Sequence, residues 1–388
     1  MSRFYDVIVL GGGFNGVMCG VGLSQSGLSV LLVEKKEEIL PGIEERVFAL
    51  SKKSRCILEG FDIWNDNLGC SPIEHIMIYD GDSCSYVHYD HALVGNEPMG
   101  YIVEAKELAK SIKEKIRFDI VTSDVYESIA TRGGFTELRL ISGTMLRSRL
   151  VVCCEGKNSL LRDIMSIKTM HYDFKQSCFV CNVHHTKQHY NTAIEHFFPG
   201  GPFAVLPMKG GFTSSIVMTE RSDIAAMLCK IPTKEFQIEL EKKCSAFLGD
   251  IEITSGVHCF GISMVFSEKQ YKERVILLGD SYHAIHPIAG QGLNLGIRDI
   301  NVLVDVIKKY NNFGSDIGHE FILKEIENRR LLDNFSMSLM TTGMNYVFTR
   351  SSTLIKIIRR ALMSIVEMSP YVKKALIKHA MGISSISS

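Results

Sequence analysis

Residues 7–16 read Val-Ile-Val-Leu-Gly-Gly-Gly-Phe-Asn-Gly, and they decide the fold of the first part of the chain. The apolar residues predict a short buried strand over 5–10, and the residues after the glycines predict a helix over 15–26. Gly11, Gly13 and Gly16 have the spacing G-x-G-x-x-G between these two elements, which is the context that a dinucleotide-binding loop requires. A glycine-rich turn without a ligand is the alternative.

Each of the three glycines has its own task in such a loop. Gly11 permits the tight turn, Gly13 lets the backbone approach a pyrophosphate, and Gly16 lets the helix and the strand pack closely. Phe14 and Asn15 lie at the start of the helix, where free N–H groups and the positive end of the helix dipole attract phosphates. We therefore expect all five residues in a cofactor site. The motif does not separate FAD from NAD.

The second predicted strand ends in an acidic residue. Residues 29–34 read Ser-Val-Leu-Leu-Val-Glu and complete a βαβ-type opening. In dinucleotide-binding folds an acidic residue about 20 positions after the last glycine binds a ribose hydroxyl. Glu34 lies close to that distance from Gly16, and we expect it to take this role.

A second glycine-rich segment lies in the last third of the chain. Residues 275–278, Val-Ile-Leu-Leu, predict a buried strand that ends at Gly279-Asp280, and a Pro- and Gly-rich loop then opens a helix near residues 292–294. The positive end of that helix would stabilise the negative charge that a reduced flavin carries near N1 and O2. From the residues alone, a strand–turn–helix with Asp280 as a helix cap is an equally open interpretation.

Composition excludes several classes of protein. Of the 388 residues, 43 are Lys or Arg and 43 are Asp or Glu, so the net charge is zero and nothing global favours nucleic acid. Cys178 and Cys181 have C-x-x-C spacing, but on a predicted strand they face opposite sides, and no second C-x-x-C completes a metal site. We expect no metal and reduced, structural cysteines. The apolar start is too short for a signal peptide, and a cytoplasmic protein is expected.

βαβ features at both ends of the chain enclose a β-rich middle. The expected fold class is therefore α/β (α+β), with a Rossmann-like FAD-binding domain that is interleaved with a β-sheet substrate domain and followed by a C-terminal helical segment. The FAD-binding domain is predicted to comprise residues 1–72, 96–168 and 272–330. The substrate domain is predicted to comprise residues 73–95 and 169–271, and the C-terminal helical segment residues 331–388. The region after residue 292 is expected to be helical, with breaks near Gly343 and Pro370.

Local patterns predict the shorter elements. A hairpin is expected over 73–90 around Asp80-Gly81-Asp82, and short strands over 118–152. Ser51 is a plausible N-cap. The other predicted helices span 51–60, 104–116 and 234–247, and the other strands span 174–185, 192–198, 202–208 and 212–219.

The second glycine-rich segment resembles a family signature. Gly279-Asp280 and residues 286–299, His-Pro-Ile-Ala-Gly-Gln-Gly-Leu-Asn-Leu-Gly-Ile-Arg-Asp, are similar to the signature of the ubiquinone-biosynthesis (UbiH-type) hydroxylases. These are flavin monooxygenases with a para-hydroxybenzoate-hydroxylase-like fold. Nearly the whole chain resembles the family, including the segments 46–51, 100–104, 201–207 and 379–382.

The resemblance assigns roles to residues of both motifs. The first motif and Glu34 would hold the ADP half of FAD, and Asp280 would contact the ribityl chain. Arg46 and Lys106 would also line the flavin site. The residues expected against the isoalloxazine are Pro287, Gly290, Gln291, Gly292, Leu293 and Asn294.

The resemblance also implies an activity. It predicts an FAD-dependent monooxygenase that hydroxylates the aromatic ring of a polyprenylated phenol in ubiquinone biosynthesis through a flavin C4a-hydroperoxide, with NAD(P)H as the reductant and O₂ as co-substrate. His286 is the candidate catalytic residue, as a proton relay, and a structural role is its alternative. Two other functions stay open: a flavin-dependent isoprenoid reductase of the same fold, and a non-catalytic lipid-binding or scaffold subunit of the ubiquinone-synthesis assembly.

Among the positions that depart from the family pattern, three bear on cofactor binding. Glu155 stands where the family has Asp, in a segment thought to help bind both flavin and pyridine nucleotide. Ala105 and Lys106 stand where Asn-Arg is common, and lysine does not reproduce the planar fork of arginine. These departures keep the scaffold hypothesis open.

The C-terminal segment suggests a further partner. Apolar residues recur at helical spacing over 354–365, and a basic amphipathic helix can lie on an anionic membrane surface. The protein would then be peripheral on the inner membrane, in a complex with other ubiquinone-synthesis proteins; a helix packed on the core with a solvated basic face is the alternative. The basic residues, against Glu367 alone, are Arg350, Lys356, Arg359, Arg360, Lys373, Lys374 and Lys378.

Overall fold

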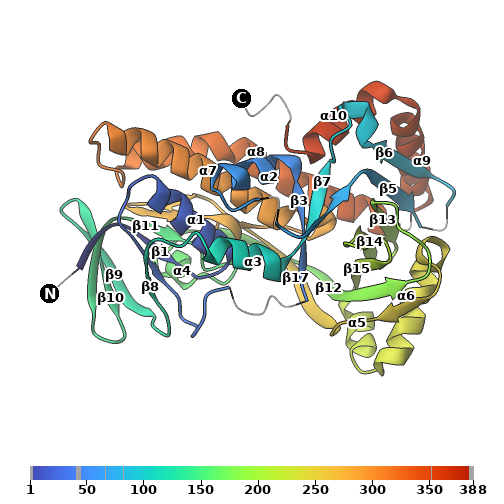
Figure 1. Cartoon of the computed structure of the whole chain (residues 1–388), viewed down its shortest axis with the longest axis horizontal. Helices are drawn as coiled ribbons and strands as arrows, with labels where there is room; N and C mark the ends of the chain where they lie inside the picture. The colour runs from blue at the N-terminus through green and yellow to red at the C-terminus, as the bar shows by residue number, and fades with distance from the viewer. Residues whose placement is uncertain (1–2, 41–44, 66, 82, 351, 384–388) are drawn as a thin grey trace.

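The chain forms two lobes, each built on its own large sheet (Figure 1). The computed structural model describes residues 3–40, 45–65, 67–81, 83–350 and 352–383. An eight-stranded sheet forms the left-hand lobe, a nine-stranded sheet forms the right-hand lobe, and a third sheet has three strands. This arrangement confirms the predicted fold class.

The sheet of the first lobe has a parallel centre in the order β19-β11-β1-β2-β8. Both faces of this centre are covered, which explains why its strands are almost entirely apolar. A hairpin, β9–β10, continues from β11, and β18 adds an antiparallel edge. These strands are β1 (Arg3–Leu10), β2 (Val30–Val33), β8 (Asp119–Val121), β9 (Tyr126–Arg132), β10 (Phe135–Leu140), β11 (Met145–Cys153), β18 (Tyr271–Lys272) and β19 (Val275–Leu277).

Helices from distant parts of the chain cover one face of this sheet. Side chains at alternate positions of β1, such as Val7 and Val9, pack with residues of α1, α7 and α8 in one core, while Ile8 and Leu10 belong to the core on the other face. The covering helices and the short α4 of the opposite core are α1 (Phe14–Gln25), α2 (Lys52–Gly60), α3 (Ala105–Lys113), α4 (Leu160–Ile164), α7 (Gln291–Asn312) and α8 (Glu320–Thr349).

The sheet of the second lobe is mostly antiparallel and runs in the order β20-β17-β12-β15-β14-β13-β5-β6, with β16 beside β12. Phe179 and Phe203 of this sheet pack against Phe236 and Leu240 of α6 in a separate core. The elements are β5 (His75–Asp80), β6 (Tyr86–Asp90), β12 (Thr169–His185), β13 (Thr192–Phe198), β14 (Gly201–Pro207), β15 (Thr213–Arg221), α5 (Ser222–Leu228), α6 (Thr233–Leu248), β16 (Ile251–Ile253), β17 (His258–Ser267) and β20 (His283–Ala284).

The strands of the two lobes alternate along the chain, so the expected interleaving is confirmed, while the residue boundaries of the domains stay a prediction. The hairpin around Asp80 is also confirmed as β5–β6, although Asp82 lies outside the described residues. The sequence patterns did not predict the long strand β17 or the small sheet, whose strands are β3 (Val47–Ser51), β4 (Cys70–Ile73) and β7 (Gly100–Glu104).

Three helices close the described part of the chain. The expected break at Gly343 is wrong, because α8 continues without interruption to Thr349. Thr341 and Asn345 are buried on either side of the glycine, and this packing outweighs the roughly 1 kcal/mol that a glycine costs inside a helix. The break at Pro370 is confirmed, since α9 (Thr353–Met368) ends there and Pro370 opens α10 (Pro370–Ala380), a position that tolerates proline. Among the described helices, none is both long and apolar enough to cross a bilayer.

A buried ion cluster fastens α8 to α7. Asp299 accepts from His283 Nε2 and from Arg330 Nε, each at 2.6 Å, and Arg330 also pairs with Asp333 at 2.6 Å. Burial alone would raise the pKa of the Asp299 carboxyl, but His283 and Arg330 outweigh this and hold that pKa below its usual range. The Asp299 carboxylate therefore stabilises the fold above its unfolded pKa, and this contribution is lost as the pH falls.

We predict that Arg330→Ala lowers the free energy of unfolding by about 3–5 kcal/mol, because it removes the buried guanidinium that pairs with the buried Asp299. The adjacent Arg329, an exposed residue paired with Glu325 one turn away, provides the control. Arg329→Ala should cost no more than about 0.5 kcal/mol. Urea denaturation followed by circular dichroism measures both, and equal losses would contradict a special role for the cluster.

Candidate active site

The predicted site residues lie at one edge of the parallel sheet. Gly11 follows β1, Glu34 follows β2, Glu155 follows β11 and Asp280 follows β19, and these four strands are neighbours. Parallel strands bring their carboxyl ends to the same edge, which is where ligands bind in open α/β sheets. The structure therefore gathers residues from three distant segments around one location.

The three glycines of the first motif meet different surroundings. Gly11 has φ of +105°, and a Cβ there would lie 2.6 Å from the carbonyl oxygen of Cys154. A Cβ on Gly16 would collide with the carbonyl oxygen of Gly11. At Gly13, in contrast, a Cβ would meet no described atom within 4 Å. The packing of the protein itself requires Gly11 and Gly16, whereas Gly13 faces open space from which a ligand can approach.

Glu34 is fixed beside this loop. Its carboxylate accepts from the backbone N–H of Gly12 and, at 2.9 Å, from that of Lys36. Gly13 is the N-cap of α1, and no described side chain caps this end of the helix. The unpaired N–H groups of the first turn therefore remain available to an anion next to a carboxylate that can bind a hydroxyl group.

Asn15 joins the first motif to the second. A Cβ added to Gly279, which has φ of +60°, or to Gly296 would collide with the amide group of Asn15. The side-chain oxygen of Asn15 is buried and has no hydrogen-bond partner among the described residues. Phe14 packs edge-on against Phe48 of β3, with the ring centroids 4.8 Å apart. Both side chains thus hold α1 against neighbouring elements of the site.

The start of α7 resembles the start of α1 in having a glycine as its N-cap. Gly290, with φ of +61°, is its N-cap, and the described side chains provide no cap here either. A Cβ on Gly292 would meet no described atom within 4 Å, so this glycine also faces open space. Pro287 and the short 3-10 turn Ile288–Gly290 lead the chain into the helix. The predicted isoalloxazine loop therefore presents an open helix N-terminus.

Asn294 holds this loop in place through its side chain. Its Oδ1 accepts from Ser51 N at 2.8 Å and from Ser54 Oγ at 2.7 Å, and its Nδ2 donates to Ala49 O at 2.8 Å. The side-chain amide of Asn294 is thereby hydrogen-bonded to residues of β3 and α2. Any contact of Asn294 with a cofactor falls to its backbone, and sequence analysis did not identify the two serines that position it.

Asp280 is accessible to solvent although protein surrounds it on most sides. This enclosure raises the pKa of the carboxyl, while His283, Arg46 and Lys157 oppose the rise. Arg46 and Lys157 thus bring positive charge to the same place, and Arg46 also lies over the ring of Phe48, 5.2 Å from its centroid.

Lys106 lies beside Glu104 at the start of α3. Its Nζ is 2.7 Å from Glu104 Oε2, and this hydrogen bond raises the pKa of the exposed Lys106. The backbone N–H of Ala105 donates to the carbonyl of Arg46 at 2.8 Å, so this position borders the start of β3. The charge of this lysine is therefore paired with a neighbouring carboxylate.

Internal hydrogen bonds occupy both carboxylate oxygens of Glu155. It accepts from Tyr126 Oη at 2.9 Å, from Ser159 Oγ at 2.8 Å and from Leu161 N at 3.0 Å. These contacts accommodate the extra methylene of glutamate without displacing the loop. Arg162, in the same segment, is buried and donates to Ser281 O at 3.2 Å, so it holds the chain next to Asp280; sequence analysis gave it no role.

His286 is buried just before the predicted isoalloxazine loop. Gln176 donates through Nε2 to Gly200 O at 2.9 Å, which turns its Oε1 toward His286 Nε2, 3.3 Å away. An amide oxygen only accepts, so the proton of the ring is assigned to Nε2, and Nδ1 is buried without a described partner. Burial lowers the pKa of His286 to about 4, and the ring is neutral at pH 7.

These features fit FAD. An elongated dinucleotide needs one anion site for its diphosphate and a second polar site for its flavin, and the structure offers two open helix N-termini, each with a glycine that faces open space. Asn15 keeps the two helix starts together. The assignments of single residues to parts of FAD stay predictions.

Comparison with known proteins decides the family. The profile of the family described as FAD binding domain matches residues 109–313, more than half of the chain. Ubiquinone hydroxylase UbiL of Rhodospirillum rubrum is 32% identical over 396 residues, which cover 98% of this chain and 90% of that protein. The chain belongs to the UbiH-type family of FAD-dependent hydroxylases. The 3-demethoxyubiquinol 3-hydroxylase of Escherichia coli is 26% identical over 97% of this chain and 98% of its own length.

Solved structures show the same fold in this UbiH-type hydroxylase. The p-nitrophenol 4-monooxygenase PnpA of Pseudomonas putida has a TM-score of 0.79 at 16% identity and covers 98% of this chain and 99% of its own. A variant of Klebsiella pneumoniae HpxO, complexed with FAD, has a TM-score of 0.76 at 16% identity over 98% of this chain and all of its own. The predicted family, FAD cofactor and enzyme class are confirmed.

We predict that Gly13→Ala weakens FAD binding at least tenfold without changing the melting temperature. Its φ of −75° suits alanine and no described atom crowds the new methyl group, so the methyl would meet only the cofactor. Gly16→Ala is the matched control and should lower the melting temperature, because its methyl collides with Gly11. Fluorescence quenching during titration with FAD measures affinity, and an unchanged affinity in Gly13→Ala would remove this residue from the site.

Proposed function

We propose that this UbiH-type hydroxylase uses FAD, NAD(P)H and O₂ to hydroxylate the aromatic ring of a polyprenylated phenol that is a precursor of ubiquinone. The observation that carries the proposal is the pair of adjacent open helix N-termini with Glu34 and Asp280 beside them. The names of the relatives, a ubiquinone hydroxylase and a 3-demethoxyubiquinol 3-hydroxylase, support the substrate class.

Different residues of the site are proposed to bind different parts of FAD. Gly13 and the N-terminus of α1 hold the diphosphate, Glu34 binds the ribose, and Asp280 binds the ribityl chain. The N-terminus of α7 stabilises negative charge on the flavin through its dipole. When bound, FAD supplies the activation of oxygen and its transfer to the ring. The residues expected around the isoalloxazine are Arg46, Lys106, Pro287, Gly290, Gln291, Gly292 and Leu293.

His286 is proposed to relay a proton at Nδ1. Its neutral state at pH 7 leaves this nitrogen as an acceptor, and the hydrogen bond to Gln176 fixes the proton on the other nitrogen. A positioning role, in which His286 only ties the flavin loop to β12 through Gln176, is the alternative. Substitution by asparagine separates the two roles, because asparagine keeps a polar partner for Gln176 but does not relay a proton at working pH.

We predict that FAD-loaded protein, supplied with NAD(P)H, isotopically labelled O₂ and a prenylated phenol, forms a hydroxylated product that carries one labelled oxygen atom. A monooxygenase places one atom of O₂ in the product and reduces the other to water. Mass spectrometry of the product measures the label, and Gly13→Ala serves as the control. A saturated isoprenoid double bond in place of a hydroxyl would favour the reductase, and a folded chain without FAD binding would favour the scaffold.

Arginines of helix α9 face the protein, and most of its large apolar side chains face outward. Arg359 pairs with the buried Asp80 of β5 and donates to Phe348 O at 2.9 Å, and Arg360 Nε lies 3.1 Å from the same carboxylate. The charged side of the helix therefore faces the protein, which is the reverse of the solvated basic face that we considered. Its apolar residues point outward and are between 51% and 84% exposed; they are Leu354, Ile357, Ile358, Leu362, Ile365 and Met368.

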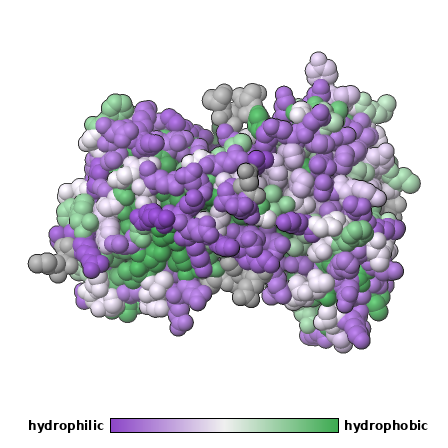
Figure 2. Space-filling model, viewed as in Figure 1, coloured by the Kyte–Doolittle hydropathy of each residue, from purple (hydrophilic) through white to green (hydrophobic). Residues whose placement is uncertain are grey.

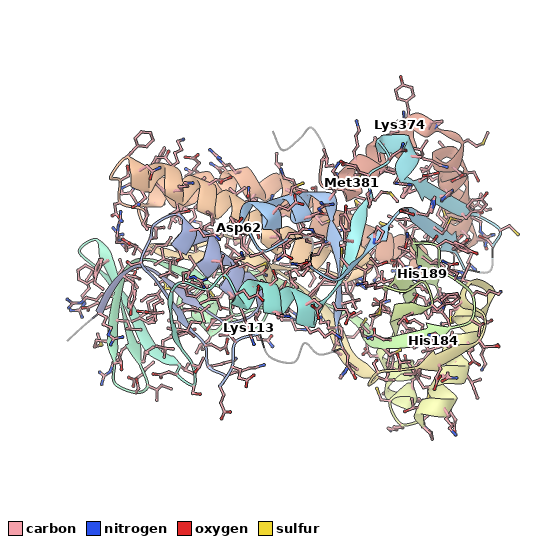
Figure 3. All side chains as sticks on the ribbon, viewed as in Figure 1. Asp62, Lys113, His184, His189, Lys374 and Met381 are labelled. Atoms are coloured by element: carbon pink, nitrogen blue, oxygen red, sulfur yellow. The ribbon has the colours of Figure 1, made fainter. Side chains whose placement is uncertain are left out.

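We propose that this outward face of α9 rests on an anionic membrane surface. An exposed apolar stripe with cations at its border is the pattern of a helix that lies in a bilayer interface. Lys374 and Lys378 of α10 are exposed, and Figure 3 shows Lys374 at the outer edge of the right-hand lobe. Figure 2 shows that the face seen in Figure 1 is mostly hydrophilic, with an apolar area over the left-hand lobe. Such a contact would bring a lipid-soluble substrate to the enzyme.

We predict that the double variant Ile357→Glu/Leu362→Glu loses most of its co-sedimentation with vesicles that contain anionic lipid. Two charges in the apolar stripe oppose insertion, while neither side chain packs in a core, so the fold should persist. Ile141→Glu, an equally exposed isoleucine on the other lobe, is the control and should bind as the parent does. Dimerisation of the parent chain with no vesicle binding would instead assign this face to a protein contact.

A further inference from the structure

A second exposed apolar surface lies between β12 and α8, separate from the stripe of α9. It consists of Met170 and Tyr172 on β12, which are 59% and 51% exposed, and Phe335 and Leu339 on α8, which are 54% and 63% exposed. We call these four residues the β12–α8 strip. Large apolar side chains that are exposed together mark interaction sites in soluble domains.

The register of the sheet places the strip on one face. Met170 lies opposite Phe266 and Tyr172 lies opposite Met264 in the antiparallel pair β12–β17, and residues directly opposite one another point to the same side. Helix α8 packs on that side. Its Ser338 Oγ lies 3.3 Å from Met264 Sδ, and the ring of Phe335 lies 6.3 Å from that of Phe266.

Aromatic rings connect the strip to the flavin loop. The centroids of Tyr172 and Phe174 are 4.9 Å apart, and those of Phe174 and His286 are 4.8 Å apart, both pairs being edge-to-face. His286 is fully buried and directly precedes Pro287. The series of rings therefore leads from solvent to the loop that we assign to the isoalloxazine.

Irregular pairing leaves this part of β12 uncovered. Residues 169–173 pair with β17 on one side, whereas pairing with β15 begins only at Gln176. The register shifts between Asp173 and Gln176, where Lys175 has φ of +56°. Asp173 and Lys175, at the end of this segment, pair with each other at 2.7 Å. The result is an exposed sheet edge that carries large apolar side chains, a feature that proteins usually avoid unless something binds there.

We propose that the β12–α8 strip binds the isoprenoid tail of the substrate. This inference rests on the proposed function, because it needs a substrate whose ring reaches the flavin loop. A linear isoprenoid carries no polar group, and it therefore favours an apolar path between the reacting ring and solvent or lipid. The rings of Tyr172, Phe174 and His286 lead from the strip to the flavin loop, and this connection distinguishes the strip from the stripe of α9.

The test compares phenols that differ only in tail length. In the parent enzyme, kcat/KM should rise from tail-less to long-tailed substrates. The double variant Met170→Ser/Leu339→Ser should lose about tenfold more kcat/KM with the long tail than with the tail-less phenol. Met227→Ser/Ile238→Ser, which alters equally exposed residues on α5 and α6, is the matched control and should keep the parent's dependence on tail length. Melting temperature and FAD content establish that both variants fold.

A second measurement does not depend on turnover. An isoprenoid alcohol that carries a photoreactive group should label peptides that contain Met170 or Leu339 in the FAD-loaded parent, and much less in the double variant. Labelling that is confined to α9, or a loss in the double variant that is the same for every tail length, would overturn the proposal. Absence of hydroxylation with any phenol, together with labelling of the strip, would overturn the proposed reaction and leave the isoprenoid site standing.

Discussion

The site depends on the contact of one asparagine with two glycines. Asn15, in the first turn of α1, occupies the space that Gly279 and Gly296 leave free, and any side chain at either glycine would displace it. This contact brings the loop after β1 and the loop before α7 together, although most of the chain separates them. Two open helix N-termini thereby become parts of one site, which neither motif forms alone.

The position of α7 is secured from both sides. Asn294 binds Ser51 and Ser54 near its start, and Asp299 binds His283 and Arg330 one and a half turns later. A helix dipole stabilises a charge only if the helix does not move when the charge develops, so these bonds support the role proposed for α7. The exposed Asp280 is held in the same way by Arg162, which binds the carbonyl of the next residue.

Sequence reasoning succeeded where the signal is local. The strands β1 and β19, the N-cap at Ser51 and the break at Pro370 each follow from a few adjacent residues. It failed where contacts between residues far apart in the sequence decide whether an element forms. Gly343 does not break α8 because residues of the sheet support the helix on both sides of it, and β17 forms because it pairs with β12 although its own sequence alternates poorly. The tie between Gln176 and His286 had no signal in the sequence for the same reason.

The orientation of α9 shows the same limit and has a functional meaning. Its periodicity defines an apolar and a basic side, but periodicity does not state which side faces the protein. Asp80, on a strand far away in the chain, pairs with Arg359 and Arg360, and burying the charge of Arg359 would be costly without such a partner. A helix that faces water alone would gain by turning its leucines and isoleucines inward. The fold instead keeps the apolar side outward through the ion pairs of Asp80 with Arg359 and Arg360, and a large exposed apolar face of this kind is the observation behind the proposed membrane contact.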